Sequence, residues 1–212
     1  MPRVIYEKLR SSRLAALTVL VLWAWPLVLL WLNRHTNLDI LLADAMFDPV
    51  TRSFPWKHSW LAENFAHGWL KMILVVLGVA IVATTVWDAV RPFARWNGEF
   101  RVRMRVLAFS AGLVPFAIGA VKRFSPMHCP WDIDRYGGQV PYFHLLDALP
   151  TGVAPGHCFP AGHASSALWL VAIAVFWLPH RPRTAGVVGS AMLLFSFALG
   201  WLQQLRGAHF LS

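Results

Sequence analysis

Two histidines and one lysine, far apart in the sequence, have side chains suited to phosphoryl transfer. Lys122 lies at the end of one apolar run, His163 begins another, and His209 follows a third. Imidazole, with a pKa of about 6.5 in water, serves as a nucleophile or a proton donor at neutral pH, and an ammonium group binds phosphate oxygens. If these runs are antiparallel helices, the three side chains meet at one end of a bundle.

Further basic and histidine residues are expected at the same end. Together they form a basic, histidine-rich collar around the end of the bundle. A collar of this charge favours an anion, and the tail of a phosphate bound there would remain among the apolar helices. The expected substrate is therefore a lipid phosphate. The collar comprises Arg123, His128, Asp132, Asp134, Arg135, His157 and Arg206.

The segment from Cys158 to Ser166 ends a loop with proline and glycine and begins a helix with small residues. Free backbone amides at a helix start bind oxyanions, and a histidine in the first turn can protonate a leaving alkoxide. Taken alone, this pattern is more typical of a helix start that carries a polar interfacial histidine.

The composition indicates a membrane protein. The chain has 212 residues, of which 57% are hydrophobic and 14% charged, and its mean hydropathy is +0.51. Disorder and a coiled coil are excluded by this composition. The net charge of +9 comes from short basic clusters between long apolar runs, which is typical of membrane loops and argues against nucleic-acid binding.

Five apolar runs are near the length of about 20 residues that crosses a bilayer. They predict an all-α, polytopic transmembrane helix bundle forming a single domain over residues 1–212. An N-terminal anchor, too long for a signal peptide core, and an interfacial helix occupy residues 1–68, and the core occupies 69–212. The runs are Leu14–Leu32, Trp69–Trp87, Val106–Val121, Gly162–Leu178 and Ala185–Leu205.

Basic residues predict the orientation. With the N-terminus inside, 11 of the 19 Lys and Arg residues lie in inner loops. The positive-inside rule therefore predicts a cytoplasmic N-terminus in the inner membrane, with the chemistry on the periplasmic or extracellular side. Residues 37–47 predict an interfacial helix with Leu38, Leu41, Leu42, Ala45 and Met46 on its apolar face and Asp39, Asp44 and Asp48 elsewhere.

Read together, three segments resemble the type 2 phosphatidic acid phosphatase family, also called the membrane acid phosphatase and vanadium haloperoxidase superfamily. Its motifs are K-x6-R-P, P-S-G-H and S-R-x5-H-x3-D. The similar segments begin at Lys122, span Pro160 to His163, and run from Gly207 to Ser212. The segments Cys129-Pro130-Trp131-Asp132 and Tyr136-Gly137-Gly138 are similar to a branch of this family.

The resemblance implies a six-helix membrane bundle that hydrolyses a phosphoric monoester or diphosphate without a metal or cofactor. His209 would attack phosphorus to form a phosphohistidine, and His163 would protonate the leaving group. Lys122, Arg123, Arg206 and the Gly162 amide would bind the phosphate. The implied substrate is a membrane lipid such as a phospholipid, a prenyl phosphate or a lipid A type molecule.

The chain departs from the family pattern at four places. Cys129 occupies the first-motif arginine position and Ala161 the serine position, while Gln203 lies where the third-motif arginine is usual, so Arg123 or Arg206 would substitute. We expect a truncated C-terminus, with the last aspartate and a sixth span beyond Ser212. The alternatives are a transporter or lipid-binding protein that retains the fold, and a lipid-to-lipid phosphotransferase.

The two cysteines leave several interpretations open. Cys129 and Cys158 each follow a histidine, and four such ligands suffice in number for zinc or copper, although their spacing fits no standard metal motif. An outward-facing compartment favours a disulfide between them, and free buried thiols are the remaining alternative. A disulfide would tether the first-motif loop to the second-motif turn.

Overall fold

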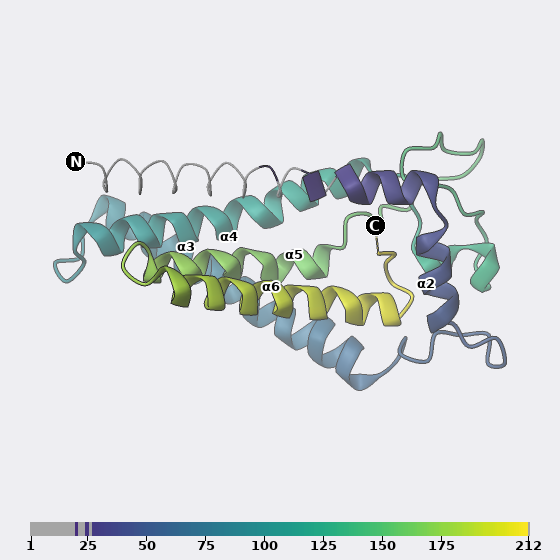
Figure 1. Cartoon of the computed structure of the whole chain (residues 1–212), viewed down its shortest axis with the longest axis horizontal. Helices are drawn as coiled ribbons and strands as arrows, with labels where there is room; N and C mark the ends of the chain where they lie inside the picture. The colour runs from purple at the N-terminus through teal and green to yellow at the C-terminus, as the bar shows by residue number, and fades with distance from the viewer. Residues whose placement is uncertain (1–19, 21–23, 26, 212) are drawn as a thin grey trace, which may run out of the picture.

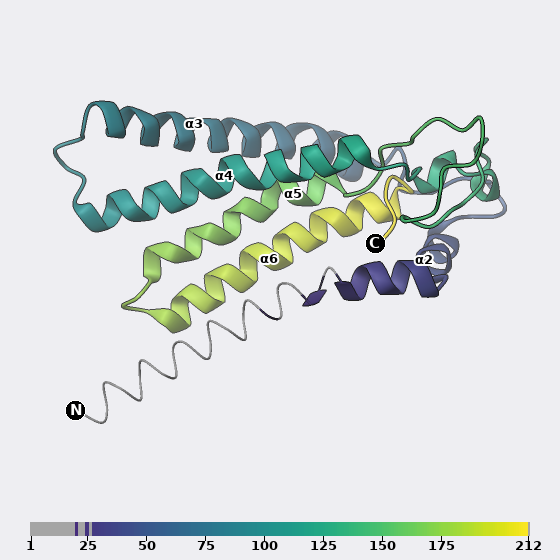
Figure 2. The same cartoon turned by 90° about the horizontal axis from the view of Figure 1, so that it is seen from above.

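The helices of the bundle run antiparallel along the long axis of the molecule (Figure 1 and Figure 2). The computed structural model describes residues 20, 24–25 and 27–211. The π-helix η1 (Leu61–Leu70) continues into α3 (Lys71–Val90), and α4 (Gly98–Phe124) returns beside it. Next, α5 (Gly162–Leu168) continues into the 3-10 helix η4 (Trp169–Trp177), and α6 (Pro182–Leu205) returns. The ends of α4 and α6 therefore lie at the same end of the bundle as the start of α5.

One hydrophobic cluster packs these segments together. Trp169 of η4 is 2% exposed and belongs to the same cluster as Leu74 of α3, Leu107 of α4 and Leu199 of α6. Gly78 allows α3 to approach the indole, because a Cβ at this position would lie 3.7 Å from Trp169 Cζ2. Because lipid is as apolar as these side chains, the cluster stabilises the fold through close van der Waals packing between the helices.

The outward-facing side chains of the long helices are also apolar. Phe116 on α4 and Val187 on α6 are 74% and 69% exposed. Within the part of the chain that the structure describes, three helices are long and apolar enough to cross a membrane, and a shorter apolar helix covers Ser166–Trp177. Because such a surface is stable against lipid rather than water, the fold is a helical membrane bundle, with no strand in the described residues. The three long helices are Leu61–Val90, Gly98–Phe124 and Pro182–Leu205.

Four of the five expected spans correspond to helical segments, but their ends differ. The predicted Val106–Val121 is the central part of the 27-residue helix α4. This helix begins earlier because its arginines find partners: Arg101 Nε lies 3.1 Å from an Asp88 carboxylate oxygen, and Arg103 donates to the Leu178 carbonyl at 2.7 Å. The expected first span, Leu14–Leu32, lies largely outside the described residues.

Helix α2 (Leu38–Met46) lies across the end of the bundle (Figure 1). The helix itself was expected, and the position of its apolar face in the membrane interface stays a prediction. Asp39 and Ala43 are buried at 3% and 2% exposure, whereas Leu41 is 63% exposed. Asp39 is tolerated inside because the Asn33 amide donates to its carboxylate at 2.8 Å.

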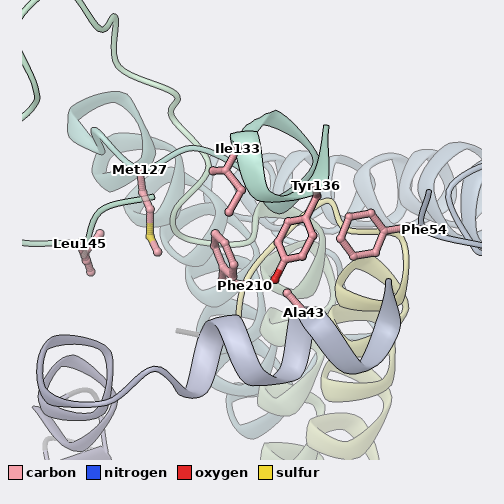
Figure 3. Packing of buried hydrophobic residues seen from close by; sticks show 7 residues of the cluster. All are labelled: Ala43, Phe54, Met127, Ile133, Tyr136, Leu145 and Phe210. Atoms are coloured by element: carbon pink, nitrogen blue, oxygen red, sulfur yellow. The ribbon is translucent and has the colours of Figure 1, made fainter. Parts of the chain in front are cut away.

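A second hydrophobic cluster makes this end of the bundle a packed cap, defined here as α2 together with residues 47–60, 125–161 and 206–211. Figure 3 shows Phe210 beside Ile133 and Tyr136, with Ala43 of α2 facing them. Tyr136 donates to Asp44 Oδ1 at 2.9 Å, and Arg135 pairs with the same carboxylate at 2.7 Å. Arg135 thus connects loop 125–161 to α2. The cluster comprises Ala43, Phe54, Met127, Ile133, Tyr136, Leu145 and Phe210.

The local backbone conformation explains why two glycines follow Tyr136. Gly137 has φ +91°, which ends a short 3-10 helix (Asp134–Tyr136) in the left-handed region. A Cβ on Gly138 would overlap the backbone of Asp132, whose carbonyl accepts the Gln139 amide at 2.9 Å. The Tyr-Gly-Gly segment therefore folds the loop after the first motif back on itself.

Candidate active site

The three motif segments meet at the capped end of the bundle (Figure 2). Lys122 lies in the last turn of α4, Gly162 and His163 begin α5, and His209 follows α6 by four residues. The contact that joins the first two segments is close, because a Cβ at Gly162 would lie 3.9 Å from Lys122 Nζ. The structure therefore brings the lysine ammonium to the start of α5, as the antiparallel arrangement predicted.

Backbone hydrogen bonds join the first-motif loop to the second-motif turn. The amides of Gly156 and Cys158 donate to Pro126 and Met127 at 3.0 and 2.8 Å. Cys129 and Cys158 form a disulfide, with Cα atoms 5.2 Å apart. Gly156 has to be glycine here, because a Cβ would lie 2.6 Å from His128 Cα. The loop that follows Lys122 and the turn that precedes Gly162 are thus one connected unit.

The third segment reverses direction after α6. Gly207 has φ +70°, and its carbonyl accepts the Trp131 amide at 3.1 Å. A Cβ on Gly207 would overlap the Phe54 ring. This left-handed residue returns the chain over the bundle end, so that His209 lies against the disulfide instead of continuing the α6 axis.

His209 is 6% exposed, and its Nδ1 lies 3.3 Å from Cys158 Sγ. A disulfide sulfur has no proton to donate, so a hydrogen bond across this contact requires the proton on Nδ1. The lone pair is then on Nε2, which is the form that a nucleophilic imidazole needs. The disulfide thus contacts the histidine at the atom that determines its tautomer.

Lys122 lines a cavity of about 290 Å³ between α3, α4 and α5. The apolar lining includes Val75, Ile118 and Trp169, and the polar lining includes Lys122, Ser166 and a second lysine, Lys71. Sequence reasoning did not select Lys71. The sequence feature that could have identified Lys71 is that it is the one charged residue in an apolar run of 19 residues, near the edge of that run.

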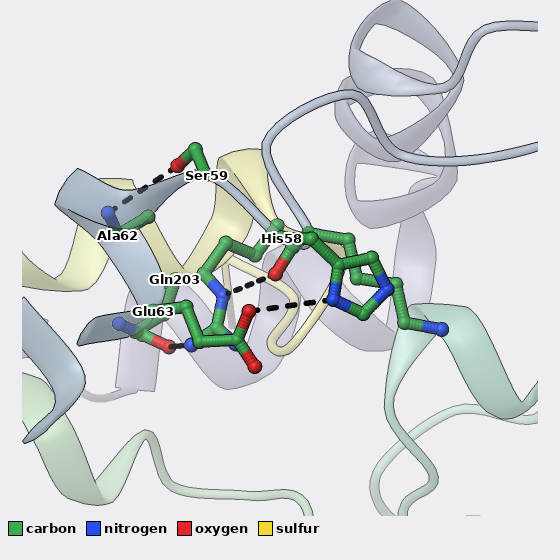
Figure 4. Close-up of polar contacts among 7 residues, drawn as sticks. His58, Ser59, Ala62, Glu63 and Gln203 are labelled. Atoms are coloured by element: carbon green, nitrogen blue, oxygen red, sulfur yellow. Dashed lines mark hydrogen bonds and ion pairs between the residues drawn. The ribbon is translucent and has the colours of Figure 1, made fainter.

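Arg206 has protein partners, and Figure 4 shows two of them, Glu63 and Gln203, beside each other. Its guanidinium donates to the Lys57 carbonyl at 3.2 Å and to Gln203 Oε1 at 3.1 Å, and Glu63 Oε1 lies 3.9 Å away. Burial lowers the pKa of Arg206, and Glu63 acts in the opposite direction. Arg206 thus connects α6 to η1, and a phosphate-binding role for it stays a prediction.

Arg123 is not brought to the cavity that Lys122 lines. It is exposed, and with Phe116 and Phe124 it lines a separate hollow of about 390 Å³ on the outer face of α4. Successive residues on a helix point about 100° apart, which places Arg123 and Lys122 on different faces. Neither Arg123 nor Arg206 is among the residues that line the cavity with Lys122.

The geometry of the cysteines bears on a metal site. Sulfur atoms of Cys129 and Cys158 and a ring nitrogen of His209 lie within 4.8 Å of one another. Metal ions bind thiolates, and both sulfurs are committed to the disulfide. His128 and His157 have other partners, the carbonyls of Ala154 and Lys122 at 2.8 and 3.2 Å. The two His-Cys pairs therefore do not form one set of four ligands.

Comparison with known proteins places this arrangement in a family. The family model of the PAP2 superfamily matches residues 103–212. No curated protein and no solved structure matches the chain. The matched region contains Lys122, His163 and His209 as well as both cysteines, and it covers just over half of the sequence. With its motif segments gathered at one end of a helical membrane bundle, the chain belongs to the PAP2 superfamily.

Proposed function

We propose that the protein is a phosphatase of a membrane lipid phosphate or diphosphate that acts through a phosphohistidine. Membership of the PAP2 superfamily supports phosphatase or phosphotransferase chemistry on lipid-like substrates. The observation that carries the proposal is the approach of Lys122 Nζ to the start of α5, at the end of the bundle where His209 contacts the disulfide. Membership of the branch with the Cys-Pro-Trp-Asp segment stays a prediction.

In the proposed first step, His209 Nε2 attacks phosphorus while the bond from phosphorus to the leaving oxygen breaks. His163 donates its proton to that oxygen, and Lys122 stabilises the charge on the phosphoryl oxygens. In the second step, water attacks the phosphohistidine, His163 takes a proton from the water, and phosphate leaves with His209 restored. Proton transfer of this kind contributes about 10²- to 10⁴-fold in rate.

The proposed orientation places the capped end outside the cytoplasmic membrane, with several helices crossing the bilayer. The opposite end carries the basic residues of the α3–α4 and η4–α6 connections, as the positive-inside rule requires for cytoplasmic loops. The disulfide is consistent with this side, because disulfides persist in oxidising compartments. The substrate tail would then remain in lipid beside the apolar helices while its phosphate reaches Lys122.

The test replaces each proposed catalytic histidine by glutamine in the full chain. We expect His209→Gln to lower phosphate release from a panel of lipid phosphates and diphosphates by at least about 10³-fold and His163→Gln to lower it by about 10²- to 10⁴-fold, without loss of folding. His180→Gln is the matched control, because His180 is 72% exposed at the opposite end, beside Glu99. Vanadate should inhibit the wild-type protein, and chelators should not.

Three outcomes separate the alternatives. Undiminished turnover by His209→Gln would refute the nucleophile assignment. Phosphate that passes from one lipid to another, with none released to water, would identify a phosphotransferase. A folded wild-type protein that binds phospholipid but neither releases nor transfers phosphate would identify a non-catalytic transporter or lipid-binding protein.

A further inference from the structure

Lys71 and Lys122 enter the same cavity from different helices. Lys71 is the first residue of α3, where the π-helix η1 changes to α-helix, and Lys122 lies in the last turn of α4. Both line the 290 Å³ cavity, so two positively charged side chains from different helices share one space. Because α3 and α4 are antiparallel, residues about fifty positions apart are brought to one level of the bundle.

The surroundings of the two ammonium groups suit an anion. Among the described residues that line the cavity, none is acidic, and the polar positions besides the lysines are Gly162 and Ser166. The nearest acid along the chain from Lys71 is Glu63, which lies 3.3 Å from His58 and 3.9 Å from Arg206. Two cations facing apolar walls repel each other, and an anion bound between them removes this repulsion.

We propose that Lys71 is a second phosphate-binding residue and that the cavity holds one phosphoryl group between Lys71 and Lys122. This inference rests on the proposed function for its substrate and assigns Lys71 a role that the motif segments do not include. Two cations on separate helices also favour a more highly charged headgroup. We therefore expect pyrophosphate to bind more tightly than inorganic phosphate, and a lipid diphosphate to be preferred over a monophosphate.

The experiment measures binding instead of turnover. Inorganic phosphate and pyrophosphate are titrated by calorimetry into the full chain in detergent micelles, as wild type, Lys71→Met and Lys57→Met. Methionine retains the length and apolar stem of lysine. Lys57 is the matched control, because it lies at the same end of the bundle, outside the cavity, with Nζ 5.4 Å from the centroid of the Trp131 ring.

We expect Lys71→Met to weaken phosphate binding about tenfold and pyrophosphate binding more, while Lys57→Met leaves both within about twofold. Lys71→Gln serves as a second variant if Lys71→Met does not fold. Equal dissociation constants for the wild type and the Lys71 variant, or a wild type that binds neither anion, would overturn the inference. A wild type that binds both anions but releases no phosphate from any lipid would refute the proposed function and leave the two-lysine site standing.

Discussion

Removal of the disulfide is the perturbation whose effect the structure predicts in most detail. Cys129 and Cys158 are 29 positions apart and join the loop after Lys122 to the turn before Gly162. The double variant Cys129→Ala, Cys158→Ala deletes the covalent link and also the sulfur that contacts His209 Nδ1. The cap then depends on its backbone hydrogen bonds and on the hydrophobic cluster around Ile133 and Tyr136.

The magnitude follows from the size of the closed loop. A crosslink that closes a loop of about 30 residues lowers the conformational entropy of the unfolded loop. This loss stabilises the folded loop by about 3.6 kcal/mol at 25 °C. Since each 1.36 kcal/mol corresponds to a factor of ten, an opening of the cap that breaks this loop should become about 100- to 400-fold more frequent. The three bundle helices that are long enough to cross a membrane keep their packing, so the loss is confined to the cap.

Amide hydrogen exchange of the protein in detergent measures this opening. The reporters are the amides of Cys158 and Trp131, which donate to Met127 and Gly207 across the cap. The control is the amide of Phe93 at the opposite end, which donates to Asp88 at 2.8 Å. We expect protection to fall about 100-fold or more at the two cap amides and to stay the same at Phe93, and phosphate release to fall with it.

Two results would refute this reasoning. Cap amides that exchange in the double variant within about threefold of their wild-type rates would show that the link adds no local stability. Thiol labelling of both cysteines in the untreated wild-type protein would show that the link is absent. Cys129→Ala alone is a further check, because it removes the link but leaves a sulfur atom beside His209.

Two more predictions concern the cap. Gly207→Ala should destabilise the cap by about 2 to 4 kcal/mol, because alanine is strained at φ +70° and its Cβ overlaps the Phe54 ring. The control is Gly112→Ala, because a Cβ at Gly112 meets nothing within 4 Å. Equal thermal stability of the two variants would contradict the prediction. The hydrogen bond from Arg135 holds the pKa of Asp44 below its usual value, so the pair should stabilise the cap above about pH 4 and lose this effect as the pH falls through the lowered pKa. Since the pair is partly exposed, Asp44→Asn should cost at most about 1 kcal/mol near pH 7 and progressively less as the pH falls below about 4, and a cost that does not change with pH would contradict this assignment.

Several features of the fold could be predicted because they depend on local sequence. Apolar runs of about 19 residues specify membrane helices whatever their neighbours are, and the described helices follow four of the five predicted spans. Their ends were less predictable. Helix α4 extends through Arg101 and Arg103 because Asp88 and the Leu178 carbonyl, distant in the sequence, accept from them.

Helix α2 shows what a hydropathy pattern leaves open. Its pattern did not predict that Asp39 is buried, which the structure explains by the Asn33 amide that donates to the Asp39 carboxylate. A buried carboxylate requires a partner, and the identity of that partner is a tertiary fact. The contacts of Arg206 have the same origin, since Glu63 approaches Arg206 only after η1 packs against α6.

By itself, the sequence determined the membrane class, the helix order and the three motif segments, because these properties follow from hydropathy and from residue identity at short spacing. Only the tertiary structure decided that Lys71 joins Lys122, that Arg123 faces outward from their cavity, and that the disulfide contacts His209. Each of these depends on how far one helix is rotated and shifted against another. That rotation is set by packing around Trp169 and in the cap, which no single segment encodes.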